Sequence, residues 1–289
     1  MFFVVKRFAP FACVAAISCL TGFAIGNSRV ATAQQSEAVT SVNPQEKVLY
    51  ANLYMQTSAE YRAVCQQIYW NATEKVRARL SEVPATETKQ PAVVMDLDET
   101  VIDNGGYQSY VDRERTTFQS KTWSDWEANY ASEVKLIPGA KAFIEYAEAN
   151  GIAVVYLSNR NVATQAGTIA ALQANGLSTV NIESRLLLQE PGTSSNKTDR
   201  RKKAMEKYRV VMIFGDNLRD FSEDFATPKL DANDTAAQFQ AIENRKTKVD
   251  AARSHFGVDW FILPNPVYGE WEKPLGANPR SKLRETSLK

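Results

Sequence analysis

The sequence is poor in histidine and cysteine, two side chains that dominate many hydrolytic sites. Its 289 residues include a single histidine, His255, and three cysteines. Zinc hydrolases generally bind their metal through several imidazoles, and enzymes that form a phosphohistidine need a nucleophilic histidine in a dedicated motif. His255 instead precedes Gly257 closely and is expected at the C-terminal end of a helix, where a positive charge suits the helix dipole. Catalytic chemistry in this chain must therefore depend on carboxylates, hydroxyls and lysine.

An excess of charge of one sign is also missing. The chain has 34 basic and 33 acidic side chains, and this balance gives no indication of a surface for a nucleic-acid polymer. The basic run at residues 200–203 is expected to be the solvated face of a helix. A nucleic-acid polymer is therefore not expected as a partner, and the sequence leaves a homo-oligomer open.

Beyond the N-terminus the chain lacks apolar runs of membrane-spanning length. Two basic residues precede an apolar stretch over residues 8–25, and small residues up to Ala33 offer a cleavage site. We expect residues 1–33 to be a signal peptide and residues 34–45 a polar linker, which makes the mature protein periplasmic or secreted. A membrane anchor and a lipid on Cys19, as in an outer-membrane lipoprotein, are the alternatives to cleavage after Ala33. Cleavage would leave one cysteine, and an internal disulfide would then be excluded.

After residue 45, short apolar runs alternate with helical periods. Thr57-Ser-Ala-Glu60 resembles a capping box that opens a helix. Strands are expected at residues 93–95, 152–158, 210–214 and 258–263, and helices at residues 143–147 and 162–172 and directly after Lys197. Strands that alternate with helices predict an α/β fold with a parallel sheet and helices on both faces. About 256 mature residues suffice for one large core, a helical N-terminal part at 46–90 and a small accessory region.

Two carboxylates directly follow the first expected strand. Val93-Val94-Met95 is apolar and β-branched, and Asp96 and Asp98 come next. Ligands of parallel α/β sheets collect outside the carboxyl ends of the strands. Two acids there repel each other unless a cation offsets their charge, and Mg²⁺ prefers such oxygen ligands. The pair also suits a reaction in which one carboxylate attacks phosphorus and the other moves protons.

Further polar residues follow the later strands in order. The second strand ends at Ser158 and Asn159, Lys197 opens a helix, and the third strand ends at Gly-Asp216, with Asp220 four residues on. Together with the Asp-Leu-Asp-Glu-Thr motif, this order resembles the signatures of the haloacid dehalogenase-like (HAD) phosphohydrolases. The resemblance implies a Rossmann-like parallel sheet with a small helical cap region.

A narrower resemblance is to the bacterial class C acid phosphatases, an exported 5′-nucleotidase lipoprotein family. It depends on the acidic motifs above, on Trp123-x-x-Trp126, and on the tail Leu-Pro-Asn-Pro-Val-Tyr268-Gly-Glu-Trp. Many members begin at a lipid-modified cysteine, which this signal fits poorly. The family also usually has threonine where this chain has Ser158, a change that keeps the hydroxyl.

The resemblance implies a role for each polar residue. Asp96 would be the nucleophile and Asp98 the general acid and base, and Mg²⁺ would bind both (Asp98 through its backbone carbonyl) together with Asp216. Ser158 and Asn159 would bind the phosphoryl oxygens. Lys197 would stabilise the transition state, although the segment also offers Arg200 and Arg201. Asp220 would orient metal-bound waters or Lys197, with helix capping as the alternative.

The insertion at residues 105–137 is rich in aromatic side chains and should lie over the site. The family places base-stacking aromatics at Trp123 and Tyr268, and core packing is the alternative for both. The function that we expect is an exported, magnesium-dependent acid phosphatase acting on phosphomonoesters, chiefly nucleoside 5′-monophosphates. A broad-specificity or sugar phosphatase and a non-catalytic phosphate-binding relative are the competing interpretations.

Overall fold

The computed structural model describes residues 46–82 and 86–286. The expected signal peptide and linker lie outside the described residues. Among the helices that are described, none is long and apolar enough to span a membrane. The account below concerns the compact unit of residues 42–289, which contains every described residue.

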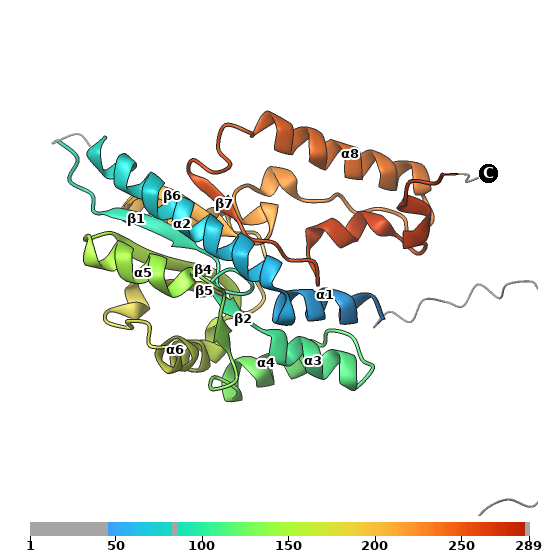
Figure 1. Cartoon of the computed structure of the whole chain (residues 1–289), viewed down its shortest axis with the longest axis horizontal. Helices are drawn as coiled ribbons and strands as arrows, with labels where there is room; N and C mark the ends of the chain where they lie inside the picture. The colour runs from blue at the N-terminus through green and yellow to red at the C-terminus, as the bar shows by residue number, and fades with distance from the viewer. Residues whose placement is uncertain (1–45, 83–85, 287–289) are drawn as a thin grey trace, which may run out of the picture. The chain divides into compact units, whose positions relative to one another are not determined.

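A five-stranded parallel sheet forms the centre of this unit (Figure 1). The strand order is β5-β4-β1-β6-β7, and every pairing in this sheet is parallel. The strands are β1 (Pro91–Met95), β4 (Ala153–Asn161), β5 (Leu186–Gln189), β6 (Arg209–Gly215) and β7 (Trp260–Ile262). The expected parallel α/β sheet is therefore confirmed. The edge strand β5 was not expected, since four residues are too few to show a period.

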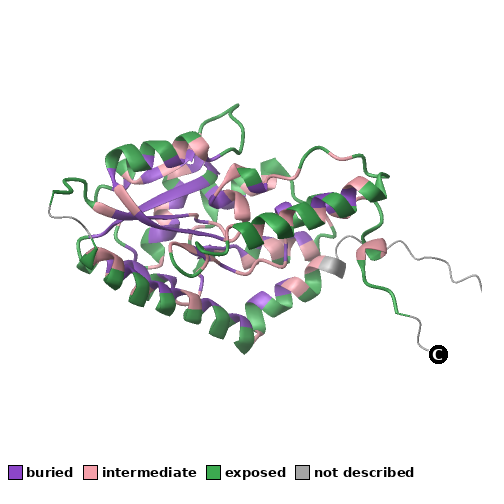
Figure 2. Cartoon of the chain, turned by 90° about the horizontal axis from the view of Figure 1, so that it is seen from above, coloured by how far each residue is buried: buried purple, intermediate pink, exposed green. Residues whose placement is uncertain are grey.

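Both faces of the sheet are covered, as the alternation of strands and helices predicted. One face packs against α2 (Ala59–Ser81), α5 (Ala140–Ala149) and α6 (Gln165–Ala174), and its core includes stacked Tyr69 and Phe214 rings. The other face packs against α7 (Thr198–Lys207) through Ala204 and Tyr208. Figure 2 shows the buried strands between helices whose outer sides are exposed.

The insertion after β1 folds into a small helical region with a two-stranded sheet. It contains α3 (Gly105–Arg113) and α4 (Ser120–Asn129), and antiparallel β2 (Ile102–Asp103) and β3 (Lys135–Leu136) close its base. The ring of Tyr107 lies against four neighbouring rings, those of Tyr110, Phe118, Trp123 and Trp126. The aromatic residues of the insertion therefore pack on one another, and Tyr107 and Trp126 join the main core cluster of the unit.

Helices at the two ends of the chain complete the unit. The first, α1 (Glu46–Thr57), contacts α3, and the Gln56 side chain donates to the Gly105 carbonyl. The last, α8 (Thr235–Ala251), packs on the tail turn η5 (Glu270–Leu275). Shorter 3₁₀ turns are η1 (Val162–Thr164), η2 (Ile182–Ser184), η3 (Leu218–Asp220), η4 (Glu223–Phe225) and η6 (Pro279–Lys282).

Two local expectations were wrong. The capping box was expected to begin at Thr57, but the N-cap of α2 is Ser58, whose hydroxyl accepts from the Tyr61 amide. Thr57 still belongs to α1, and its hydroxyl donates to the Leu53 carbonyl.

His255 was expected at the C-terminal end of a helix, but it lies beyond the end of α8. Its ring stacks on Trp260 at 4.4 Å and its Nδ1 lies 3.0 Å from a carboxylate oxygen of Asp259.

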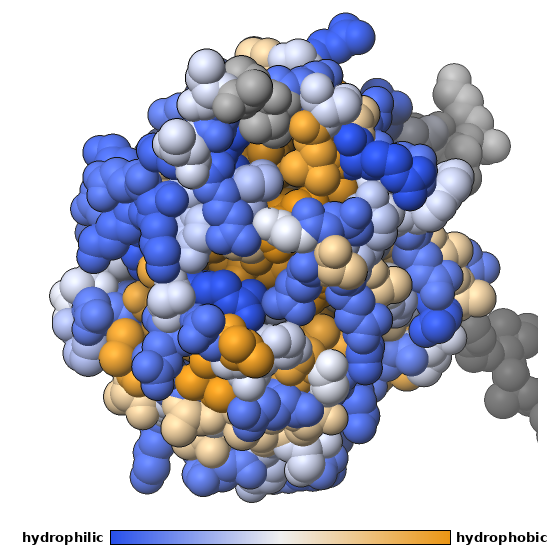
Figure 3. All heavy atoms as spheres, turned by 90° about the vertical axis from the view of Figure 1, so that its left-hand side faces the viewer, coloured by the Kyte–Doolittle hydropathy of each residue, from blue (hydrophilic) through white to orange (hydrophobic). Residues whose placement is uncertain are grey.

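The strands of the sheet run away from the side of the unit that Figure 3 shows. Strand β1 begins at the side of the unit that Figure 3 faces, where most of the surface is hydrophilic and hydrophobic atoms show near the middle. The carboxyl ends of the strands lie at the opposite end of the sheet.

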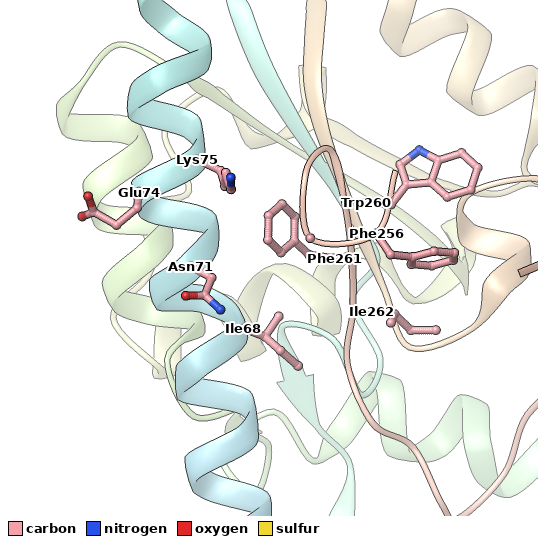
Figure 4. A pocket seen from close by; sticks show the side chains of 9 residues that line it. Ile68, Asn71, Glu74, Lys75, Phe256, Trp260, Phe261 and Ile262 are labelled. Atoms are coloured by element: carbon pink, nitrogen blue, oxygen red, sulfur yellow. The ribbon is translucent and has the colours of Figure 1, made fainter. Parts of the chain in front are cut away.

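A groove of about 420 Å³ lies between α2 and the edge strand β7 (Figure 4). Ile68 and Phe261 line it, and none of the predicted site residues does.

Candidate active site

The carboxyl ends of four adjacent strands bring the predicted residues to one edge of the sheet. Asp96 follows β1, Ser158 and Asn159 lie near the end of β4, Asp216 follows β6, and Asn265 comes shortly after β7. The β1 strand is central and almost wholly buried, so Asp96 starts from a rigid support. These residues are up to 169 positions apart in the sequence (265 minus 96) and meet only because the strands run parallel.

Asp96 and Asp220 flank Lys197. The Nζ of Lys197 lies 2.8 Å from Asp96 Oδ1 and 2.7 Å from Asp220 Oδ1, and the lysine is 3% exposed. Burial alone would lower the pKa of Lys197, but the two carboxylates outweigh it and raise the pKa. The ammonium therefore stays charged, beside the predicted nucleophile. Of the three cations that the sequence offered, the structure places Lys197 against Asp96.

The neighbouring arginines bond other groups. Arg200 donates to the Ser158 carbonyl and, at 2.6 Å, to the side-chain oxygen of Asn159. Arg201 donates to the backbone carbonyls of Arg219 and Asp220. Arg200 therefore supports the end of β4, while Arg201 supports the turn after β6.

The acidic residues at this edge are held close together in a buried setting, which raises the pKa of Asp96 and of Asp216. Burial raises the pKa of Asp96, the charge of Lys197 opposes this, and the charges of Asp220 and Asp98 add to it, so that the resulting pKa is about 7. Burial, followed by the charges of Asp220 and Asp96, also raises the pKa of Asp216 well above its usual range. A bound cation would reverse these shifts, because it favours the charged carboxylates.

The donor set fits a hard divalent cation. Carboxylate oxygens of Asp96, Asp216 and Asp220 lie within 4.8 Å of one another, and they are the oxygen ligands that Mg²⁺ prefers. Asp220 already uses both oxygens, one on Lys197 and one on the Asn217 amide at 2.9 Å. These bonds of Asp220 match an orienting role.

Asp220 is held where it is by a close approach of the backbone. A Cβ on Gly215 would lie 2.4 Å from the Asp220 side chain, so the strand can pass this carboxylate only with glycine at 215. The Asn217 side chain and Asp220 form a capping box around η3. Capping was the alternative that the sequence left for Asp220, and the structure shows the capping contact together with the Lys197 ion pair.

Asp98 has a different environment from Asp96. Its Oδ1 accepts from Arg160 Nε and from Asn104 Nδ2, both at 2.9 Å, while its Oδ2 has Ser158 Oγ at 3.4 Å. No role was expected from the sequence for Arg160 or Asn104. A charged residue within the last three positions of β4, directly after Ser158-Asn159, was the signal that could have identified Arg160.

Asp216 is tied to the tail of the chain. Asn265 Nδ2 donates to Asp216 Oδ2 at 2.8 Å, and Asn265 Oδ1 accepts from the amides of Val267 and Tyr268. Asn265 was part of the tail motif, but no role was expected for it. The contact brings the tail to the site, where it holds one oxygen of Asp216.

The two aromatic residues expected to bind the substrate are both partly buried. The Trp123 ring meets Tyr107 edge-on at 4.9 Å, and the Arg160 guanidinium lies 5.7 Å from its centroid. Tyr268 packs against the main core cluster. Each ring therefore takes part in packing, and each retains an accessible portion.

A parallel sheet with a nucleophilic aspartate candidate, a neighbouring lysine and a further aspartate at its carboxyl edge defines a hydrolase of the HAD class. Residues 15–271 match the family described as HAD superfamily, subfamily IIIB (Acid phosphatase). The chain belongs to this family and is a phosphomonoesterase.

Solved structures agree with this assignment. A class C acid phosphatase from Bacillus anthracis with tungstate bound is 30% identical, with a TM-score of 0.72 over 85% of this chain and 100% of that one. A second structure of the Bacillus anthracis class C acid phosphatase is 29% identical, with a TM-score of 0.71 over the same shares.

Proposed function

We propose that this acid phosphatase is magnesium-dependent and hydrolyses phosphomonoesters through a phospho-aspartate, with nucleoside 5′-monophosphates as its main substrates. The observation that carries the proposal is the contrast between two nearby carboxylates. Asp96 lies against Lys197 and near Asp216, whereas Asp98 is held apart by Arg160 and Asn104. Carboxylates in such different environments suit different roles, one as nucleophile and one as acid and base.

In the first half-reaction, a carboxylate oxygen of Asp96 attacks phosphorus. The bond from phosphorus to the ester oxygen breaks, and Asp98 donates its proton to the departing alkoxide. Ser158 and Asn159 at the end of β4 would bind the phosphoryl oxygens. The ammonium of Lys197 offsets the negative charge that spreads over those oxygens in the transition state.

In the second half-reaction, Asp98 takes a proton from water while the water oxygen attacks the phospho-aspartate. The bond between phosphorus and the Asp96 oxygen breaks, which releases inorganic phosphate and restores the carboxylate. Asp98 ends protonated, ready for the next ester. The two steps therefore balance with water as the only co-substrate.

The residues that would hold Mg²⁺ are Asp96, Asp216 and the backbone carbonyl of Asp98. The bound ion would neutralise the carboxylates and offset the charge of the dianionic substrate. Asp220 would keep Lys197 in place, and Asn265 would orient Asp216.

Substrate preference and location complete the proposal. Trp123 from the insertion and Tyr268 from the tail would stack on a nucleobase, which favours nucleotides over sugar phosphates. We also propose that residues 1–33 direct export and that the mature enzyme works in the periplasm or outside the cell. A lipid anchor on Cys19 remains the alternative to cleavage after Ala33.

The test is a phosphate-release screen of the purified mature protein across nucleotide, sugar and aryl monoesters. Activity should vanish after EDTA dialysis and return with Mg²⁺, while Zn²⁺ should restore little, because imidazole and thiolate ligands are scarce. A flat substrate profile would support the broad-specificity alternative. Full turnover after exhaustive chelation would overturn the metal requirement.

A further inference from the structure

A buried arginine contacts the predicted acid and base. Arg160 is 1% exposed and has the largest side chain among those that are almost fully buried. Its Nε donates to Asp98 Oδ1, and its two terminal nitrogens donate to Asn104 Oδ1 at 2.9 Å and Thr168 Oγ1 at 3.4 Å. Burial of a guanidinium is costly unless a charged and well-bonded partner compensates it. Asp98 is that partner, and the pair lies at the site.

Asn104 completes the support of the same carboxylate oxygen. Its Nδ2 donates to Asp98 Oδ1 at 2.9 Å and to Glu99 Oε1 at 3.2 Å. Its Oδ1 accepts from Arg160 and from the indole N–H of Trp126 at 2.9 Å. Arginine and the indole N–H can only donate, so these partners fix which way the Asn104 amide faces. The amide is therefore held rigidly against Asp98.

This support begins in the aromatic insertion. Trp126 lies on α4, is buried, and also touches the ring of Tyr107. Gly106 leaves space for the indole, since a Cβ there would come within 2.7 Å of it. The chain of contacts runs from Trp126 through Asn104 to Asp98, so the packing of the insertion reaches the site.

The two oxygens of Asp98 are held differently as a result. Oδ1 is bonded by both Arg160 and Asn104, whereas Oδ2 has the longer contact to Ser158. Because Arg160 and Asn104 both donate to Oδ1, a proton on Oδ1 would face two donors. Oδ2 is therefore the oxygen that can carry the proton. Rotation of the carboxylate would break two hydrogen bonds to buried donors, which is unfavourable.

We propose that Arg160 is a positioning residue that, together with Asn104 and Trp126, fixes the Asp98 carboxylate so that Oδ2 faces the leaving group. The inference rests on the proposed function, in which Asp98 protonates the departing oxygen. In this scheme Arg160 contacts the side chain of Asp98 and not the ester, and the metal would be bound by the backbone carbonyl of Asp98 instead of by the oxygen that Arg160 holds. Its effect is exerted through the orientation of Asp98.

The leaving group provides the test. An alkoxide needs a proton as it departs, whereas p-nitrophenolate leaves readily without one. Because kcat/KM reports the steps up to leaving-group departure, a misplaced acid should reduce kcat/KM for a nucleoside 5′-monophosphate far more than for p-nitrophenyl phosphate. For Arg160→Met we expect the ratio of the two kcat/KM values to fall by about tenfold or more, since general acid catalysis contributes about 10²–10⁴-fold.

A matched control is available just before β5, where Arg185 contacts the amino-terminal end of β4. Arg185 is also largely buried, and it bonds Glu148 and the Val154 carbonyl, both at 3.0 Å. Arg185→Met should lower the melting temperature and leave the substrate ratio unchanged. Arg160→Lys, which keeps the charge but loses the fork of donors, should recover part of the ratio.

Two further variants keep the inference falsifiable. Trp126→Phe retains the ring and removes one donor, so it should shift the ratio in the same direction by less, and it decides the matter if Arg160→Met does not fold. Equal losses on both substrates in the folded variants would overturn the inference. Asp98→Asn separates this failure from that of the proposed function: if its loss is also independent of the leaving group, Asp98 is not the acid.

Discussion

At the scale of single residues, the site separates two carboxylates by the hydrogen bonds around them. Asp96 has a lysine and a buried setting, while Asp98 has an arginine and an amide on one oxygen. The position of both aspartates at the carboxyl end of the central strand could be predicted from the sequence, because they directly follow an apolar run. The contacts of Arg160 and Asn104 with Asp98 could not be predicted, because they are made by side chains that meet across the sheet and the insertion.

The first prediction concerns the nucleophile. Asp96→Asn should abolish turnover and leave the fold intact, because the amide has nearly the same shape but is a poor nucleophile. The loss should span several powers of ten, and each power corresponds to about 1.4 kcal/mol of barrier. Steady-state kinetics and a thermal melt measure the two effects. Activity above about a tenth of wild type would remove Asp96 from this role.

The second prediction concerns pH and the stability of the metal-free protein. The folded pKa of Asp96 is about 7, whereas an unfolded aspartate titrates near pH 3.9. The raised value means that the stabilising contribution is complete below about pH 4 and is lost as the pH rises to about 7. Burial shifts the pKa of Asp216 in the same direction.

Urea unfolding in EDTA across this range measures the effect. The free energy of unfolding should fall with rising pH, and Asp96→Asn should flatten the profile. Mg²⁺ should stabilise the protein more at neutral pH than at pH 4, because the carboxylates then bind it without first losing protons. Parallel profiles for the two proteins would show that Asp96 does not carry this pH dependence.

At the scale of elements, helix α2 depends on the residue that begins it. The Ser58 hydroxyl accepts a hydrogen bond from the Tyr61 backbone amide at 3.0 Å, whereas the Thr57 hydroxyl donates to the Leu53 carbonyl within α1. Ser58→Ala should therefore lower the free energy of unfolding by about 1 kcal/mol. Thr57→Ala is the matched control and should cost clearly less. Equal costs from urea titrations would mean that the cap is shared between the two residues.

Helices and strands could be predicted where the apolar pattern was long and a glycine marked its end. Glycine marks the end of α5 at Gly151 and of α6 at Gly176, and the four predicted strands all occur in the sheet. The join between α1 and α2 could not be placed correctly, because Thr57 and Ser58 are both good caps. Tertiary packing decided between them.

At the scale of the whole unit, the insertion and the tail reach the same edge of the sheet as the acidic residues. If Trp123 and Tyr268 stack on a base, Trp123→Ala and Tyr268→Ala should each reduce kcat/KM for AMP about five- to a hundredfold, from roughly 1–3 kcal/mol of stacking. Phenyl phosphate, which has less to stack, should lose much less. Equal losses on both substrates, or losses that follow the melting temperature, would assign these rings to packing.

The distribution of the site over the chain has a consequence for folding kinetics. Asp96 follows the central strand, but Asn265, which holds Asp216, arrives only after the edge strand β7. A partly folded chain without β7 would lack the Asn265 amide that orients Asp216, so a cation could bind tightly only after the last strand has docked. Mg²⁺ should then slow unfolding while leaving the refolding rate nearly unchanged, because it stabilises contacts that form after the folding transition state.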